Sequence, residues 1–259
     1  MSSNNDTIGK TLTVTILLCV ICSVVVSAAA VLLKPKQVAN KELDRKSNIL
    51  AAAGISDPSK SVDELFAQIE TRYVDLDSGK FVEEPVANYD AAKAAKDPEL
   101  GHPVPRSEDI ASIKYQANVM PVYIVRDAAN DLEKVILPVH GYGLWSTLYG
   151  FLALEGDLNT IVGLGFYSHA ETPGLGGEVD NPAWKALWPG KEVYAEDTTD
   201  PEIRLIKGSV GAETADAEHK VDGLSGATLT SNGVTYLLQY WMGENGYAPF
   251  LNNLRAGEA

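Results

Sequence analysis

The sequence predicts an α+β protein with a single N-terminal transmembrane helix, and three observations carry this prediction. The run from Leu12 to Leu33 has no charged residue and is long enough to cross a lipid bilayer. Between residues 120 and 167, apolar runs alternate with turns in the manner of an antiparallel meander. Helical patterns lie before and after this meander, which favours a largely antiparallel sheet with flanking helices over a doubly wound sheet.

Composition narrows the class of protein. The chain has 259 residues, of which 45% are apolar and 22% are charged, enough for one substantial domain besides the apolar run. Its formal net charge is −14, so we expect no nucleic-acid partner, because binding to phosphates requires clustered Lys and Arg. Both cysteines, Cys19 and Cys22, lie in the apolar run, so the remainder of the chain forms no disulfide.

The apolar run is interpreted as a retained membrane anchor. We expect a tail over residues 1–11 and a transmembrane helix over 12–33, which spans about 33 Å at 1.5 Å per residue. A cleaved signal peptide is the alternative, since residues 27–30 are small. The run is longer than a usual signal-peptide core and continues past these small residues, which favours the anchor.

The charges that flank the anchor predict a cytoplasmic domain. Lys10 precedes the anchor, whereas five basic residues follow it closely: Lys34, Lys36, Lys41, Arg45 and Lys46. By the positive-inside rule, the C-terminal domain would stay in the cytoplasm. Large domains can nevertheless cross the membrane despite flanking charge, so both orientations stay open on this evidence.

Cys19 and Cys22 lie on one face of the predicted anchor. A redox-active dithiol requires a polar, partly exposed environment that favours the thiolate. We therefore interpret the pair as small residues for helix packing, together with Ser23, Ser27 and Ala28. Contact with a metal or cluster is the alternative, because thiolates bind iron and copper.

Residues 34–110 are predicted to be a helical lead-in to the domain, which spans 111–259. A helix is expected over residues 40–53, ended by Gly54, and a short one over 90–96. Between them, a Ser-x-x-Glu capping box at Ser61 opens another helix. Its expected buried stripe is Val62, Leu65, Phe66 and Ile69.

Two strand pairs form the predicted meander. Residues 122–126 and 134–139 flank one turn, and residues 148–154 and 160–167 flank another. After them, Asp180-Asn181-Pro182 opens a short helix, because Pro suits the first helical turn. Residues 203–207 read as a further strand, followed by a polar loop.

Two glycine-rich loops lie at strand ends. In the first, His140–Trp145, glycines permit close backbone approach and Trp145 offers a large flat face, although an ordinary packing role is the alternative. The second, His169–Gly177, lacks the third small residue of a dinucleotide fingerprint and the lysine of a P-loop. Its expected polar tips, Glu171 and Thr172, suit the edge of a planar heterocycle better than a triphosphate. The four histidines show no metal-ligand spacing, so we expect no metal site.

The most informative stretch is Asp222–Thr228, a run of small residues that ends in a hydroxyl just before a helix. The helix is indicated by an apolar stripe, and Thr230 or Ser231 is expected to cap it. The stripe is Val234, Leu237, Leu238 and Trp241. Unpaired N–H groups at a helix start favour a phosphate at or near Thr228. A tight turn into a capped helix is the plainer alternative.

This stretch resembles the D-x-x-[ST]-G-A-T flavinylation motif of covalent FMN-binding domains. The matching residues are Asp222, Ser225, Gly226, Ala227 and Thr228. Together with the anchor, the Trp145 loop and the Glu171–Gly176 loop, it makes the chain resemble the C subunit of bacterial sodium-translocating NADH:quinone oxidoreductases. The G subunit of the related ferredoxin:NAD electron-transport complex shares the domain and is the closest competitor.

The resemblance implies one FMN, esterified through its phosphate to Thr228 by a separate FAD-dependent flavin transferase. It further implies an electron-relay subunit between NADH and quinone, not catalytic alone, in a multisubunit complex of the inner membrane with its domain facing the periplasm. We expect the isoalloxazine ring to pack against Trp145 and Leu175, with Glu171, Thr172 and Gly176 at its edge. An autonomous flavin reductase, for which no nicotinamide fingerprint is found, and a flavin-free anchored interaction module are the other classes.

Overall fold

The computed structural model describes residues 7–196 and 198–259, and it divides into two units, Met1–Asp44 and Arg45–Ala259. The first unit is helical: α1 runs from Ile8 to Ala52 and contains Pro35. Its start lies inside the predicted tail, of which residues 1–6 are outside the described residues. Among the described residues, α1 is the one helix long and apolar enough to cross a membrane.

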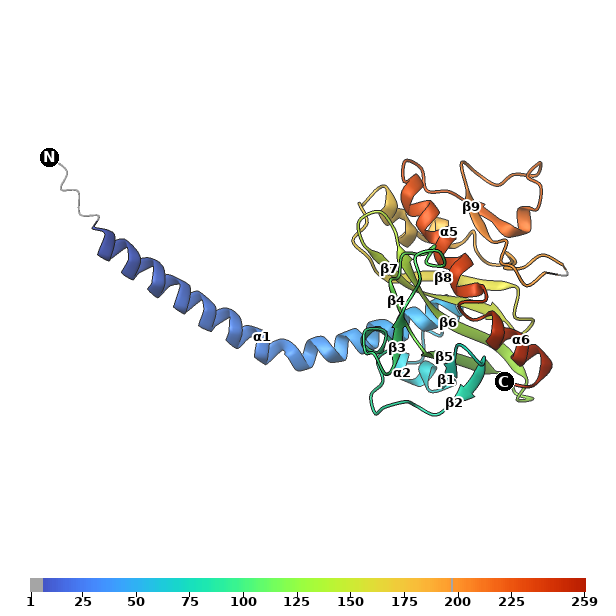
Figure 1. The fold of residues 1–259 in the computed structure, drawn as a ribbon, viewed down its shortest axis with the longest axis horizontal. Coiled ribbons are helices and arrows are strands. Elements are labelled where there is room, and N and C mark those ends of the chain that lie inside the picture. The colour runs from blue at the N-terminus through green and yellow to red at the C-terminus, as the bar shows by residue number, and fades with distance from the viewer. Residues whose placement is uncertain (1–6, 197) are drawn as a thin grey trace. The chain divides into compact units, whose positions relative to one another are not determined.

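The second unit is built on a six-stranded antiparallel sheet with the order β2-β1-β5-β6-β7-β8 (Figure 1). The strands are β1 (Ile69–Asp75), β2 (Lys80–Val82), β5 (Val119–Arg126), β6 (Leu132–Tyr142), β7 (Thr147–Glu155) and β8 (Ile161–Ser168). Both predicted strand pairs are confirmed as antiparallel neighbours, β5 with β6 and β7 with β8. The α+β fold class with a largely antiparallel sheet is therefore confirmed.

The prediction of a helical lead-in is wrong over residues 69–75 and 80–82, which form β1 and β2 on either side of a turn. The capping box at Ser61 is present, but α2 spans only Val62–Phe66. Ile69, expected on the buried face of that helix, instead begins β1 and pairs with Val125 in β5. The physical reason lies in the side chains of β1, whose β-branched and aromatic residues favour a pleated, half-buried surface.

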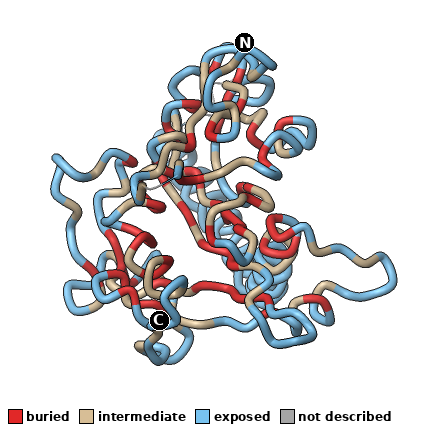
Figure 2. Tube along the Cα trace, turned by 90° about the vertical axis from the view of Figure 1, so that its right-hand side faces the viewer, coloured by how far each residue is buried: buried red, intermediate tan, exposed pale blue. Residues whose placement is uncertain are grey.

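The two faces of the sheet are covered by different helices. Alternate residues of β6 separate them: Leu137 belongs to the core under α5 (Thr228–Met242) and α6 (Ala248–Ala256), and Ile136 belongs to the core on the opposite face. That second core includes Ile49, from the part of α1 that lies in this unit. Figure 2 shows the buried residues gathered in the interior of this unit, with mostly exposed residues along its outer loops.

Short elements complete this unit. They are α3 (Ala91–Ala94), β3 (Gly101–Pro103), β4 (Tyr115–Ala117), η1 (Gly176–Asp180), α4 (Pro182–Lys185), β9 (Arg204–Ile206), η2 (Ala217–His219) and β10 (Lys220–Asp222). The predicted helix after Asp180 is confirmed, with Asn181 capping it through a bond from the N–H of Ala183. β9 and β10 pair in parallel, and β10 leads directly into the stretch before α5.

Candidate functional site

The start of α5 defines the first part of the site. The helix begins at Thr228, its N-cap is Ala227, and no side chain caps it. The predicted cap by Thr230 or Ser231 is therefore wrong: both residues lie inside the first turn and are buried. Thr228 is exposed at the end where a helix offers unpaired N–H groups and positive potential.

Ser231 stabilises the turn that precedes α5 through two hydrogen bonds. Its hydroxyl accepts a hydrogen bond from the N–H of Leu224 at 2.9 Å and donates to the carbonyl of Ala227 at 3.1 Å. This internal role explains why it is not an N-cap, since its oxygen bonds backward to the turn and not to a later first-turn N–H. The apolar stripe of α5 is confirmed: Val234, Leu237, Leu238 and Trp241 are all buried.

The stretch before Thr228 is fixed by contacts with the surrounding loops. The carboxylate of Asp222 accepts a hydrogen bond from the N–H of Val210 at 2.7 Å, and its carbonyl accepts one from the indole of Trp184 at 3.0 Å. Gly226 has a positive φ of 73°, and a Cβ there would lie 3.0 Å from Leu175. Ser225 and Gly226 are exposed, whereas Ala227 is buried beneath them. The motif thus forms an exposed turn on a rigid base.

Glu171 differs from its expectation as an exposed polar tip. Its side chain is only 5% exposed, and its carboxylate bonds within the chain. One oxygen, Oε1, accepts hydrogen bonds from the backbone N–H groups of Leu144 at 3.1 Å, Trp145 at 3.0 Å and Ser146 at 3.3 Å. The other, Oε2, accepts one from the hydroxyl of Thr230 at 2.7 Å. Both predicted loops and the start of α5 therefore meet at this carboxylate.

Glycines make this meeting possible. A Cβ on Gly176 would lie 2.5 Å from the Thr230 hydroxyl and 2.7 Å from Glu171 Oε2. On Gly143 it would lie 2.7 Å from Glu171 Oε1, and on Gly233 it would lie 2.4 Å from a carbonyl of the first loop. No other residue type fits at these points without displacing the neighbouring atoms.

The carboxylate of Glu171 is held in its ionised form. Burial by itself raises the pKa of Glu171, but the four hydrogen bonds, with that from Thr230 the strongest influence among them, outweigh burial. The net pKa therefore lies below its ordinary value of 4.5.

Exposed apolar side chains surround the start of α5. Trp145 is 64% exposed, Leu175 is 43% exposed and Leu229 is 58% exposed. Sequence reasoning identified the first two but missed Leu229, although Leu229 is an apolar residue that falls outside the buried stripe of its own helix. It also missed the roles of Thr230 and of Ser146, whose hydroxyl accepts from the N–H of Ala170 at 2.7 Å.

Thr172 and His169 shape the second loop. The carbonyl of Thr172 accepts hydrogen bonds from the N–H groups of Leu175 at 3.1 Å and Gly177 at 2.9 Å, which closes the turn. His169 lies 2.8 Å from the carboxylate of Asp180, so its ring pairs within the domain. The part of the chain that the structure describes contains no group of three or more candidate metal ligands.

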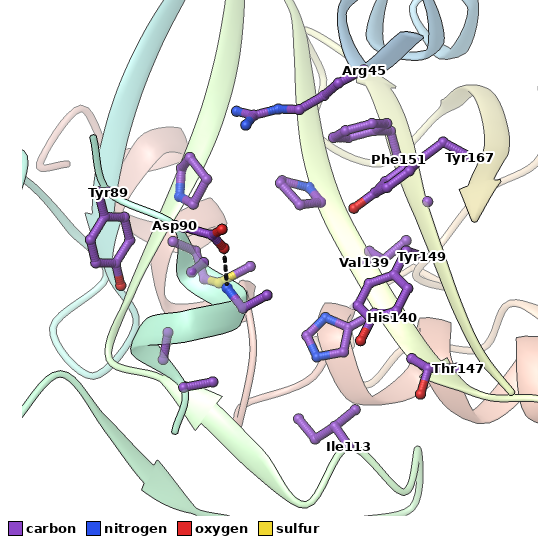
Figure 3. Close-up of a pocket in the computed structure, with 18 of the residues that line it drawn as sticks. Arg45, Tyr89, Asp90, Ile113, Val139, His140, Thr147, Tyr149, Phe151 and Tyr167 are labelled. Atoms are coloured by element: carbon purple, nitrogen blue, oxygen red, sulfur yellow. Dashed lines mark hydrogen bonds between the residues drawn. The ribbon is translucent and has the colours of Figure 1, made fainter. Parts of the chain in front are cut away.

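A cavity of about 240 Å³ lies elsewhere, on the sheet face that carries Tyr123 and Phe151 (Figure 3). Its labelled lining includes Arg45, Asp90, His140, Tyr149 and Tyr167. None of the ten residues predicted to bind the cofactor lines it, so the cavity is separate from the candidate site.

The site combines an exposed hydroxyl at a helix start, an apolar rim and glycines that allow close approach. These features fit a planar group that carries a phosphate, held at its phosphate end by the turn before α5. Residues 143–243 match the family model described as the FMN-binding domain. The fold and the site therefore define an FMN-binding domain on a single-pass membrane anchor.

The chain is similar over its whole length to curated relatives. It is 53% identical to the C subunit of the Na(+)-translocating NADH-quinone reductase of Pseudomonas aeruginosa, covering 99% of this chain and 100% of the relative. It is 50% identical to the C subunit of the same reductase from Vibrio alginolyticus, and the match covers 100% of this chain and 99% of that relative. The chain belongs to the family of Na(+)-translocating NADH-quinone reductase C subunits. This membership favours the predicted C subunit over the alternative, the G subunit of the ferredoxin:NAD electron-transport complex.

Solved structures agree with the family. The crystal structure of Shewanella oneidensis NqrC matches with a TM-score of 0.77 and 37% identity, covering 84% of this chain and 99% of the other. The C subunit of the reductase from Parabacteroides distasonis matches with a TM-score of 0.64 and 26% identity, covering 86% and 96%. The antiparallel domain is thus the family's fold.

Proposed function

We propose that this chain is the membrane-anchored electron-transfer subunit of a sodium-translocating NADH:quinone oxidoreductase and carries FMN covalently on Thr228. It relays electrons from NADH toward quinone together with other subunits and is not catalytic alone. The observation that supports this proposal best is the exposed Thr228 at the start of α5. There the Trp145 loop meets the second glycine-rich loop, His169–Gly177. The flavin supplies the redox chemistry, and the protein binds and orients it.

Thr228 is the best placed hydroxyl of the motif. Thr230 is fully buried and donates to Glu171, and Ser231 is bonded to the turn, so neither is available for attachment. Ser225 is exposed and is the remaining competitor. The negative charge of a phosphodiester on Thr228 is favoured by the free N–H groups and the dipole of α5.

Attachment requires a partner enzyme. A threonine hydroxyl is a weak nucleophile and needs a base or a metal for activation. The motif from Asp222 to Thr228 contains neither His nor Cys, and the carboxylate of Asp222 is bonded to Val210. We therefore assign activation to a separate FAD-dependent flavin transferase, which recognises the exposed turn at Ser225 and Gly226.

The ring lies among the exposed apolar residues in this proposal. Trp145 and Leu175 pack on it, Leu229 adds apolar surface, and Thr172 and Gly176 supply contacts at its edge. Glu171 acts on the ring through the Trp145 loop, since its carboxylate already has four donors within the chain.

Replacement of Thr228 by valine tests the attachment. The wild-type chain, produced with the transferase, should retain flavin after denaturation and gain the mass of FMN less one water. Thr228→Val should lose both signals and keep the fold, because it replaces only the hydroxyl by a methyl group of similar size at an exposed position. Peptide mapping of the wild-type chain is the control and should place the FMN on Thr228. Flavin that persists on Thr228→Val, or that maps to Ser225 in the wild type, contradicts the assignment.

Orientation is a separate part of the proposal. The domain faces the periplasm, as the family resemblance implies, despite the basic residues that follow the anchor. Protease added to intact spheroplasts should digest the domain. Protection in spheroplasts, with digestion only in inverted vesicles, would place the domain in the cytoplasm.

A further inference from the structure

The loop that carries Trp145 is held in an unusual way. Trp145 is 64% exposed and Leu144 is also exposed, so burial in the core does not fix their positions. One backbone hydrogen bond closes the loop, from the N–H of Gly143 to the carbonyl of Ser146 at 2.9 Å. Its side chain at Ser146 accepts a hydrogen bond from the N–H of Ala170 at 2.7 Å, and three successive backbone N–H groups converge on Glu171.

Three successive N–H groups pointing at one oxygen form a concave anion-binding site. Here the anion is the side chain of Glu171, from another loop of the same chain. Its second oxygen bonds to Thr230, 59 residues later in the sequence and in the first turn of α5. One carboxylate therefore connects the Trp145 loop to the helix that begins at Thr228.

We propose that ionised Glu171 is a positioning residue that fastens the Trp145 loop to the start of α5 and thereby sets the environment of the flavin. The part that concerns the flavin rests on the function proposed above. The fastening itself does not, because every contact in it lies within the chain.

The charge of Glu171 is essential to this role. Glutamine has nearly the same shape and can still accept the three N–H groups through its oxygen, with its amide nitrogen toward Thr230. Hydrogen bonds to an ionised acceptor are roughly twice as strong as neutral ones, so the glutamine variant keeps the contacts but weakens them. A buried negative charge also disfavours the addition of electrons nearby, so its removal raises the potential of a flavin in the site.

Amide hydrogen exchange on flavin-free protein tests the fastening. The full chain in detergent, with Thr228→Val to exclude flavin, provides the reference. Glu171→Gln should speed exchange at residues 144–146 by about tenfold, which corresponds to about 1.4 kcal/mol, and Glu171→Ala should speed it further. Quenching of Trp145 fluorescence should rise in parallel, because a loosened loop exposes this side chain more often. The other three tryptophans, Trp184, Trp188 and Trp241, are buried and contribute little to the quenching.

Glu178 provides the matched control. It follows in the same segment, and its carboxylate accepts one bond, from Asn181 at 2.7 Å. Glu178→Gln should leave exchange at residues 144–146 unchanged. Exchange at Val234 and Leu237, in the buried part of α5, should be the same in every variant and so establishes that the domain remains folded. Unchanged exchange at 144–146 in both Glu171 variants would overturn the proposal.

The flavin-loaded protein, with Thr228 intact, tests the consequence. Glu171→Gln should keep the mass of the attached flavin but raise its midpoint potential and alter its fluorescence, whereas Glu178→Gln should change neither. An unaltered potential and spectrum in Glu171→Gln would show that this carboxylate does not act on the flavin. Loss of the mass increase in the wild type would instead refute attachment at Thr228, and the exchange result would still stand.

Discussion

His140 offers a direct test of how burial in this domain controls protonation. It lies in β6, and its ring stacks on that of Tyr149 with centroids 5.4 Å apart and an angle of 21° between the rings. On another side it lies 4.9 Å from the ring of Trp241. Figure 3 shows the imidazole at the wall of the cavity beside Tyr149. No hydrogen bond to its ring nitrogens occurs within the described residues.

Burial lowers the pKa of His140 from 6.5 to about 4, and the carboxylate of Asp109 offsets this only in part. The folded state therefore takes up the proton at lower pH than the unfolded state. Above about pH 6.5, both states are neutral at this residue and it causes no pH dependence. As the pH falls from about 6.5 to about 4, the unfolded state gains a proton that the folded state lacks, so stability is lost.

The two pKa values differ by about 2.5 units, which corresponds to a loss of about 3 kcal/mol at 1.36 kcal/mol per unit. His140→Phe keeps an aromatic ring between Tyr149 and Trp241 but cannot titrate. The free energy of unfolding of the wild type should therefore fall by about 3 kcal/mol more than that of the variant between pH 7 and pH 4. Carboxylates titrate equally in both proteins and cancel in this comparison.

Urea unfolding of the full chain in detergent provides the assay. Tryptophan fluorescence reports on the domain, because all four tryptophans lie between residues 145 and 241. The imidazole of His140 can also be followed by NMR, where its chemical shifts should stay those of the neutral form down to about pH 5. Stability curves that run parallel for the two proteins, or an NMR midpoint near 6.5, would refute the reasoning.

Three further substitutions test other parts of the domain. Trp145→Ala should leave FMN attached but shift its fluorescence or potential, with little effect on unfolding, because the side chain is mostly exposed; an unchanged flavin would mean that Trp145 does not contact it. Gly176→Ala places a Cβ 2.5 Å from Thr230 and should lower the free energy of unfolding by about 1–3 kcal/mol, whereas Gly165→Ala, with open space around it, should not show this clash. Tyr247→Phe removes a partly buried hydrogen bond of 2.8 Å to a β6 carbonyl and should cost about 1–2 kcal/mol in urea unfolding; no loss would mean that the bond does not stabilise the fold.

The parts of the fold predicted from sequence are those specified by local pattern. The anchor, the two hairpins from β5 to β8 and the buried stripe of α5 each depend on periodicity within a short window. The local sequence pattern does not indicate β1, because its residues follow directly after the capping box of α2 and Ile69 continues the apolar stripe of that helix. Its place in the sheet depends on pairing with β5, about fifty residues later, which no local pattern specifies.

The same distinction applies to the candidate site, which has one part that is local in the sequence and one part that depends on long-range contacts. The turn from Asp222 to Thr228, where we propose that FMN is attached, is contiguous in the chain and exposes Ser225, Gly226 and Thr228, so a short sequence motif can indicate it. The surroundings proposed for the flavin ring are not contiguous in the sequence, because they depend on the hydrogen bonds by which Glu171 joins the Trp145 loop to Thr230.

The two parts of the site should respond differently to mutation. In the function proposed above, attachment depends on the exposed hydroxyl of Thr228, whereas the hydrogen bonds of Glu171 are buried and do not include that hydroxyl. Loss of Thr228 should therefore leave the loop arrangement intact, and loss of the Glu171 charge should leave the flavin attached. Under the proposed function, substitutions at buried residues such as Glu171 can therefore change the potential of the flavin without changing the exposed turn before α5.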